Sequence, residues 1–208
     1  AARMSDSISS GRVYSTVLEK ERRGDYLGKT VQVVPHVCDT IQTWLERVAQ
    51  VPVDGGNEEP EVCLVEVGGT VGDLESAQFL EALRQLQMRL PPSDFCMCHV
   101  SLVPSINAEQ KTKPTQHGVM ELRRLGPAPD LLFCRTGGQP LEASARDKLA
   151  LFCQTPADHV LSVHDASTVY HVPPLLAAQG VLELLRAKLG LGNIGAPTPA
   201  QPLAKWNA

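Results

Sequence analysis

The sequence has no excess of basic residues, no long apolar run and no apolar segment near its first residue. Lysine and arginine number 19 against 23 aspartate and glutamate, which gives a formal net charge of -4 at pH 7. A large basic groove for nucleic acid is therefore not expected, although a local cationic cluster can still bind a small anion. The longest apolar stretches are far shorter than the ~20 residues of a membrane span. Ala1 to Ser10 is polar and lacks the apolar core of a secretory signal, so we expect a cytoplasmic protein without membrane contact.

Signatures of covalent and metal chemistry are also scarce. The sequence has no G-x-S-x-G elbow and no recognisable context for a catalytic cysteine. Its six cysteines are scattered through apolar runs, which predicts free thiols in a reducing compartment. Cys96-Met97-Cys98-His99 resembles a metal motif, but no second cysteine pair lies at zinc-finger spacing. In a strand, Cys96 and Cys98 share one face and His99 takes the other, so we predict buried packing for this run.

Apolar periodicity predicts an α/β fold in which strands and helices alternate. Four strand-then-helix units are expected, and a further helix over His36 to Val48 precedes them. Such units imply a parallel sheet flanked by helices. The predicted pairs are Val62–Val65 with Ser76–Leu90, Phe95–Val103 with Thr115–Leu125, Asp130–Cys134 with Glu142–Phe152, and Val160–Val163 with Pro173–Leu189. From Gly190 onward the chain is rich in Gly, Pro and Ala, which is typical of a linker or tail.

Polar clusters follow each predicted strand, over residues 66–75, 109–116, 136–148 and 164–168. Ligands of open parallel sheets bind outside the carboxyl ends of the strands. We therefore expect all four clusters to lie at one edge of the sheet and to converge on one ligand.

The first cluster combines Glu66 with a glycine-rich turn and with Asp73 and Glu75. A carboxylate at a strand end beside glycines suits Mg²⁺ with a phosphate nearby, because Mg²⁺ is held by one or two carboxylates plus substrate oxygens. A turn whose acids are solvated, or cap the next helix, explains the spacing equally well.

The second cluster is Lys111-Thr112-Lys113-Pro114-Thr115-Gln116. Two ammonium groups and a helix start preset by a proline could hold a triphosphate, and Thr115 and Gln116 could contact a base or sugar. On composition alone an exposed basic loop is the commoner explanation, by roughly two to one. A third run, Tyr26 to His36, has Lys29-Thr30 without the glycines of a P-loop, and we expect a structural role for His36.

These clusters, in this order, resemble the synthetase half of the CTP synthase family. The similar runs are residues 24–36, 66–76, 109–117, 125–135, 148–153 and 163–173, and the phrase Glu-Gln-Lys-Thr-Lys-Pro-Thr-Gln is very specific to that family. The resemblance implies a P-loop NTPase-like, dethiobiotin-synthetase-like domain at residues 1–191. It lacks the N-terminal P-loop, and residues 192–208 form a linker toward a glutaminase domain that is also absent from the sequence.

The resemblance also implies ligands and partners. Family members make CTP from UTP, ATP and glutamine-derived ammonia, are inhibited by CTP, and form homotetramers whose UTP and CTP sites draw on neighbouring subunits. Glu66 would hold Mg²⁺ beside the ATP triphosphate, and His164, Asp165 and Ala166 would contact adenine. The implied UTP or CTP contacts are Asp73, Leu74, Glu75, Lys111, Thr112, Lys113, Pro114, Thr115, Gln116 and Lys148.

Some positions depart from the family pattern. Ala108 replaces a usual glycine, Gly118 a usual serine, and His164 stands where Arg or Lys is common. Without the P-loop lysine, we expect a chain that does not form CTP alone and that is poorly stable. Two other hypotheses remain: a non-catalytic relative that assembles with full-length subunits, and another amidoligase of the same fold. The Lys-Thr-Lys-Pro-Thr-Gln phrase argues against the latter.

Overall fold

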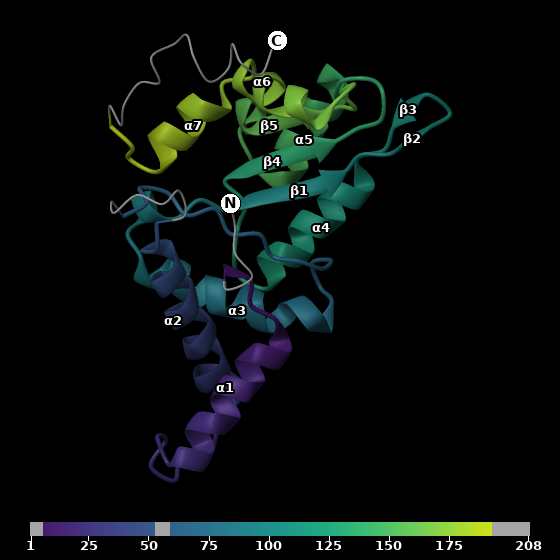
Figure 1. The fold of residues 1–208 in the computed structure, drawn as a ribbon. Coiled ribbons are helices and arrows are strands. Elements are labelled where there is room, and N and C mark those ends of the chain that lie inside the picture. The colour runs from purple at the N-terminus through teal and green to yellow at the C-terminus, as the bar shows by residue number, and fades with distance from the viewer. Residues whose placement is uncertain (1–5, 53–58, 193–208) are drawn as a thin grey trace. The chain divides into compact units, whose positions relative to one another are not determined.

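The structure is a computed structural model that describes residues 6–52 and 59–192. It divides into two compact units, residues 1–86 and 87–208, each with its own hydrophobic core (Figure 1). The predicted tail at 192–208 lies outside the described residues except for Gly192. Within the described residues, no helix is both long enough and apolar enough to cross a membrane.

The first unit is helical. Helix α1 spans Ser10–Arg23, a π-helical turn covers Val33–Val37, α2 spans Cys38–Ala49 and α3 spans Leu74–Arg89, just past the boundary of the unit. The backbone N–H of Arg12 donates to Ser9 Oγ at the start of α1, and Gly24 ends the helix at φ 83°. Both are standard end signals. The core of this unit consists of Val13, Val17, Val37, Cys38, Ile41 and Ala82.

The second unit is built on a parallel sheet with the strand order β1-β4-β5. The strands are Cys98–Leu102, Leu131–Arg135 and Val160–Val163. Leu102 pairs with Arg135 and Arg135 pairs with Val163, so the three strands end at the same level. This register creates one common carboxyl edge.

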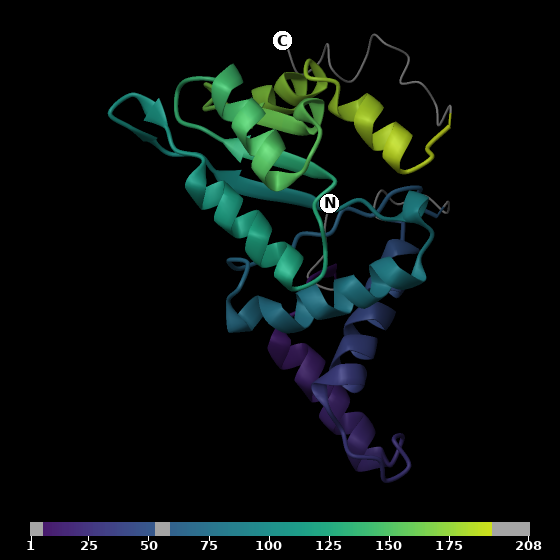
Figure 2. The same ribbon diagram turned by 180° about the vertical axis from the view of Figure 1, so that it is seen from behind.

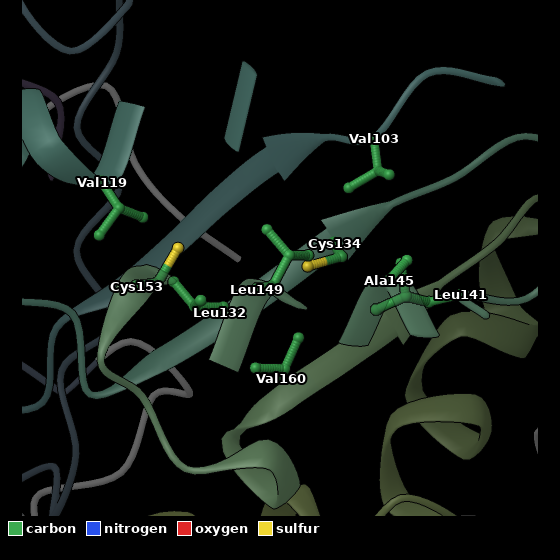
Figure 3. Close-up of a cluster of buried hydrophobic side chains, with 9 residues drawn as sticks. All are labelled: Val103, Val119, Leu132, Cys134, Leu141, Ala145, Leu149, Cys153 and Val160. Carbon is green, nitrogen blue, oxygen red and sulfur yellow. The ribbon is translucent and has the colours of Figure 1, made fainter. Parts of the chain in front are cut away.

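Helices cover both faces of this sheet. Helices α4 (Lys113–Arg124) and α5 (Ala143–Cys153) lie on one face, where Leu132 and Cys134 of β4 meet Val119 and Leu149 (Figures 2 and 3). Helices α6 (Val172–Ala177) and α7 (Val181–Lys188) pack near Leu131 and Leu161, in a separate cluster. Alternate residues of β4 thus serve two cores, as a strand buried on both faces requires.

Short elements complete this unit. Strands β2 (Ser105–Ile106) and β3 (Glu109–Gln110) form an antiparallel hairpin after β1. Three 3-10 turns cover Pro92–Asp94, Ala157–His159 and Val169–His171.

The predicted fold class, a parallel sheet flanked by helices, is confirmed, but one predicted strand is wrong. Val62–Val65 is not a strand, and Leu64 is 96% exposed. A strand needs a neighbour to accept its backbone hydrogen bonds, and within the described residues the sheet of β1, β4 and β5 has no strand from this run. The helix predicted over Pro173–Leu189 is two helices, because Gly180 adopts φ 79° between them.

Candidate functional site

The carboxyl edge of the sheet carries three of the four polar clusters. The chain leaves β1 toward the β2–β3 hairpin and α4, leaves β4 toward α5, and leaves β5 at His164. The ladder extends one residue beyond the strands, since Val103 N–H donates to the Arg135 carbonyl and Thr136 N–H to the Val163 carbonyl. The first residues after β1 and β4 are therefore held by the sheet.

The hairpin presents the lysine-rich loop. Asn107 and Ala108 turn the chain with φ values of 53° and 62°. The backbone N–H of Lys111 donates to the Pro104 carbonyl at 2.8 Å, which closes the loop on itself. The Lys111 ammonium forms an ion pair with Glu109. The Lys111 ammonium also donates a hydrogen bond to this carboxylate, which is the largest cause of the lowered pKa of Glu109. The positive charges of Lys111 and Lys148 lower that pKa further.

The first turn of α4 is anchored by its threonines. Thr115 is fully buried; its hydroxyl accepts from Ser101 Oγ at 3.0 Å and donates to the Leu102 carbonyl at 3.3 Å. Gln116 Nε2 donates to the hydroxyl of the buried Thr112 at 3.0 Å. The two threonine side chains therefore face the protein, and a ligand at this helix start would meet backbone N–H groups and the lysines.

Gln110 ties the lysine loop to α5. Its side chain is 7% exposed; Nε2 donates to the Pro140 carbonyl at 2.9 Å, and Oε1 accepts from Glu142 N–H at 2.8 Å. Because Glu142 precedes α5, this bridge couples the loop that carries Lys111 to the helix that carries Lys148. Nothing in the local pattern around Gln110 signals the bridge, since its partners lie about thirty residues away.

A groove of about 790 Å³ runs along α4 beside the end of α5. Its lining includes Lys113, Pro114, Gln116 and Arg123 of α4 and Phe152 of α5. The Lys113 ammonium lies 5.7 Å from the centre of the Phe152 ring, which is 56% exposed. An exposed aromatic ring beside cations is a surface on which a nucleobase can stack. Sequence reasoning missed Phe152, because an aromatic residue in an apolar helical run reads as core.

The cluster after β5 is held by an ion pair across the edge. Arg135 donates to Asp165 Oδ1 at 3.1 Å, and Asp165 N–H to the Gly137 carbonyl at 3.4 Å. His164 Nδ1 is buried without a hydrogen-bond partner in the described chain, and Ala166 is exposed. An orphaned ring nitrogen is costly to bury. Sequence reasoning did not single out Arg135.

The acidic cluster belongs to the first unit, and the described residues 59–65 that precede it form no strand. Glu66, Asp73 and Glu75 are exposed, and Leu74 is 89% exposed. Asp73 N–H donates to the Thr70 carbonyl at 3.1 Å, which forms a turn at the start of α3. Within residues 6–52 and 59–192, no group of three or more His, Cys, Asp or Glu side chains could hold a metal ion. A single exposed carboxylate fits Mg²⁺ only when substrate oxygens complete the shell. Convergence of this cluster with the lysines remains a prediction.

The run from Tyr26 to His36 is structural in this unit. Gln32 N–H donates to His36 Nδ1 at 3.0 Å, and the ring of Tyr26 meets the His36 ring edge-on at 4.6 Å between centroids. The structural role predicted for His36 is confirmed. Lys29 is exposed.

Comparison with known proteins identifies the family to which the chain belongs. A family model described as "CTP synthase N-terminus" matches residues 1–191. The chain belongs to the CTP synthase family.

Curated CTP synthases are similar over most of the chain. "CTP synthase" of Schizosaccharomyces pombe is 58% identical over 189 residues, covering 91% of this chain and 31% of that relative. "CTP synthase 1" of Saccharomyces cerevisiae is 49% identical over 207 residues, with 97% and 36% covered. "CTP synthase 1-A" of Xenopus laevis is 51% identical over 203 residues, with 97% and 34% covered. The chain spans about a third of the length of these relatives.

Two positions in the second unit have clear local consequences. Ala108 adopts φ 62°, a region that disfavours a Cβ. A Cβ at Gly118 would lie 3.2 Å from His99 Nε2. The Ala108 side chain therefore strains the hairpin, whereas the glycine at position 118 makes room for the His99 ring against α4.

Proposed function

We propose that this chain is the nucleotide-binding synthetase part of a CTP synthase, a ligase of pyrimidine biosynthesis that converts UTP to CTP. In the proposed reaction ATP phosphorylates the 4-oxygen of uracil, and ammonia derived from glutamine displaces the phosphate. The assignment of UTP amination concerns the whole enzyme, because the chain matches about a third of its relatives.

The observation that carries this proposal is the gathering of cations at the carboxyl edge. Lys111 and Lys148 both lower the pKa of the Glu109 carboxyl, and Lys113 begins α4 two residues after Lys111. A triphosphate brings several negative charges, and lysines with helix N–H groups neutralise them. The ion pair of Lys111 with Glu109 would open as the triphosphate replaces the carboxylate.

The remaining assignments follow the same chemistry. The uracil ring of UTP, or the cytosine of CTP as product inhibitor, would stack near Phe152 and meet Pro114 and Gln116. Thr112 and Thr115 would hold the loop rather than touch the ligand by their side chains. Asp73, Leu74 and Glu75 would complete the pyrimidine nucleotide site, provided that their turn reaches the lysines.

ATP would bind next to this site. His164, Asp165 and Ala166 would face adenine, with Arg135 holding Asp165 in place. Glu66 would supply one oxygen to Mg²⁺, whose other ligands would be phosphate oxygens. When bound, that ion neutralises charge on the transferring phosphoryl group. A homotetramer in the cytoplasm is part of the same proposal.

Calorimetry of CTP and UTP binding tests the lysine site. Lys111→Ala and Lys113→Ala each remove a charge-assisted hydrogen bond of about 1.5–3 kcal/mol, so the dissociation constant should rise roughly tenfold to a hundredfold. Arg186→Ala, on the exposed side of α7, removes one positive charge elsewhere and should leave binding unchanged. Equal affinity of all three variants and the parent for CTP would refute the site.

A further inference from the structure

Cys96 and Cys98 form a pair of thiols that the nucleotide site does not use. Their sulfur atoms lie 4.0 Å apart, and both cysteines are free. Cys98 opens β1 and is exposed, whereas Cys96 is half-buried beside Leu131 and Phe133. The predicted common face is confirmed, but buried packing is wrong for Cys98.

The backbone between the two thiols is clamped to the start of β4. Met97 N–H donates to Asp130 Oδ2 at 2.8 Å. The Met97 carbonyl accepts from Asp130 N–H at 2.7 Å and from Leu131 N–H at 3.2 Å. Three hydrogen bonds thus fix Met97, the residue between the two cysteines. A ligand that bridges the sulfurs would meet a pair whose backbone is already ordered, which lowers the entropic cost of binding.

A charge close to the pair is balanced by an ion pair. Asp130, whose Oδ2 accepts from Met97 N–H, lies 2.9 Å from the Lys188 ammonium. A cation placed between the sulfurs would replace the two thiol protons.

The distance between the two sulfur atoms and the number of available ligands indicate the class of cation. The two sulfur atoms are not bonded to one another in this structure. Sulfurs 4.0 Å apart can both contact one ion at metal–sulfur bonds of about 2.3 Å. Zinc requires four ligands, and no group of three or more metal-ligating side chains occurs in the part of the chain that the structure describes. Soft two-sulfur coordination suits monovalent copper.

We propose that Cys96 and Cys98 form a two-thiolate site for copper(I), separate from the carboxyl edge that the nucleotides would occupy. On binding, two S–H bonds are replaced by two Cu–S bonds, two protons pass to the buffer, and copper keeps its oxidation state. Cys98 begins β1 and the lysine loop follows the other end of that strand, so the two sites lie at opposite ends of the strand. His99 faces away toward Gly118 of α4 and is not a ligand.

Anaerobic titration with copper(I), buffered by a chromogenic copper(I) chelator, tests this proposal. The purified 208-residue chain should withdraw one copper(I) ion and show near-ultraviolet sulfur-to-copper absorption. Cys96→Ser and Cys98→Ser should each lower the affinity at least tenfold, since a single sulfur cannot chelate. Cys63→Ser removes a lone exposed thiol and should bind copper as the parent does.

Circular dichroism of the serine variants separates loss of a ligand from loss of the fold. Nucleotide binding by the same variants should be unchanged, so failure of this site is distinguishable from failure of the proposed function. Copper uptake that survives Cys98→Ser, uptake that depends on Cys63, or no uptake by the parent would each overturn the proposal. Equally tight zinc binding by the parent would overturn the choice of a soft ion.

Discussion

Removing the amide of Gln110 should uncouple the lysine loop from α5. Gln110→Met keeps the length and volume of this buried side chain but deletes the bonds to the Pro140 carbonyl and the Glu142 N–H. Each hydrogen bond contributes a net of about 0.5–1.5 kcal/mol. Pro140 and Glu142 are exposed residues, so water partly replaces the lost partners. We therefore expect the free energy of unfolding to fall by about 1–3 kcal/mol.

Urea denaturation followed by far-ultraviolet circular dichroism measures this loss. Gln139→Met is a matched control, because Gln139 is exposed in the same connection and only its backbone carbonyl is used, by Thr136. The folded Gln110→Met chain should also bind UTP more weakly. The loop that carries Lys111 is then no longer fixed to the start of α5, the helix that carries Lys148. An unfolding free energy within about 0.5 kcal/mol of the parent, with unchanged UTP affinity, would refute the bridging role.

Two further predictions concern stability. Ala108→Gly relieves the positive φ of the hairpin turn and should raise the free energy of unfolding by about 0.5–1 kcal/mol in the same urea assay; a decrease would contradict the strain. Arg84 holds the pKa of the Glu81 carboxyl at about 2, so the folded chain binds this proton more weakly than the unfolded chain. This stabilisation is complete above the ordinary pKa of about 4.5 and is lost as the pH falls toward about 2. Because the pair is partly exposed, Glu81→Gln should lower stability by only about 1 kcal/mol at pH 6. At pH 3 the loss should be less than half as large, since the Glu81 carboxyl of the unfolded chain is then protonated. Equal losses at both pH values would contradict this assignment.

The local residue pattern was sufficient to predict several elements. The strand at Val160–Val163 is found as predicted, and α4 and α5 begin and end within two residues of their predicted limits. Apolar periodicity and the Pro and Gly signals carry that information. Helix α1 was not predicted, although Ser9 and Gly24 mark its two ends.

Contacts between segments far apart in the chain could not be predicted in the same way. Arg135 reaches Asp165, Gln110 reaches Glu142, and Phe152 meets Lys113, each over a separation of thirty residues or more. Their partners are known only once the strands are in register. The same limit explains the false strand at Val62–Val65, because apolar character does not supply a neighbour for its backbone.

The sequence by itself determined the chemistry of this protein: which lysines, carboxylates and glycines are present, and that three of the four polar clusters follow strands. It also determined the family, through a run of motifs around Lys111 to Gln116. Only the tertiary structure decided that Thr115 is buried while Phe152 is exposed, and that Asp130 binds the backbone between the two cysteines. Burial and distance depend on contacts between segments far apart in the chain, and local residue patterns do not encode them.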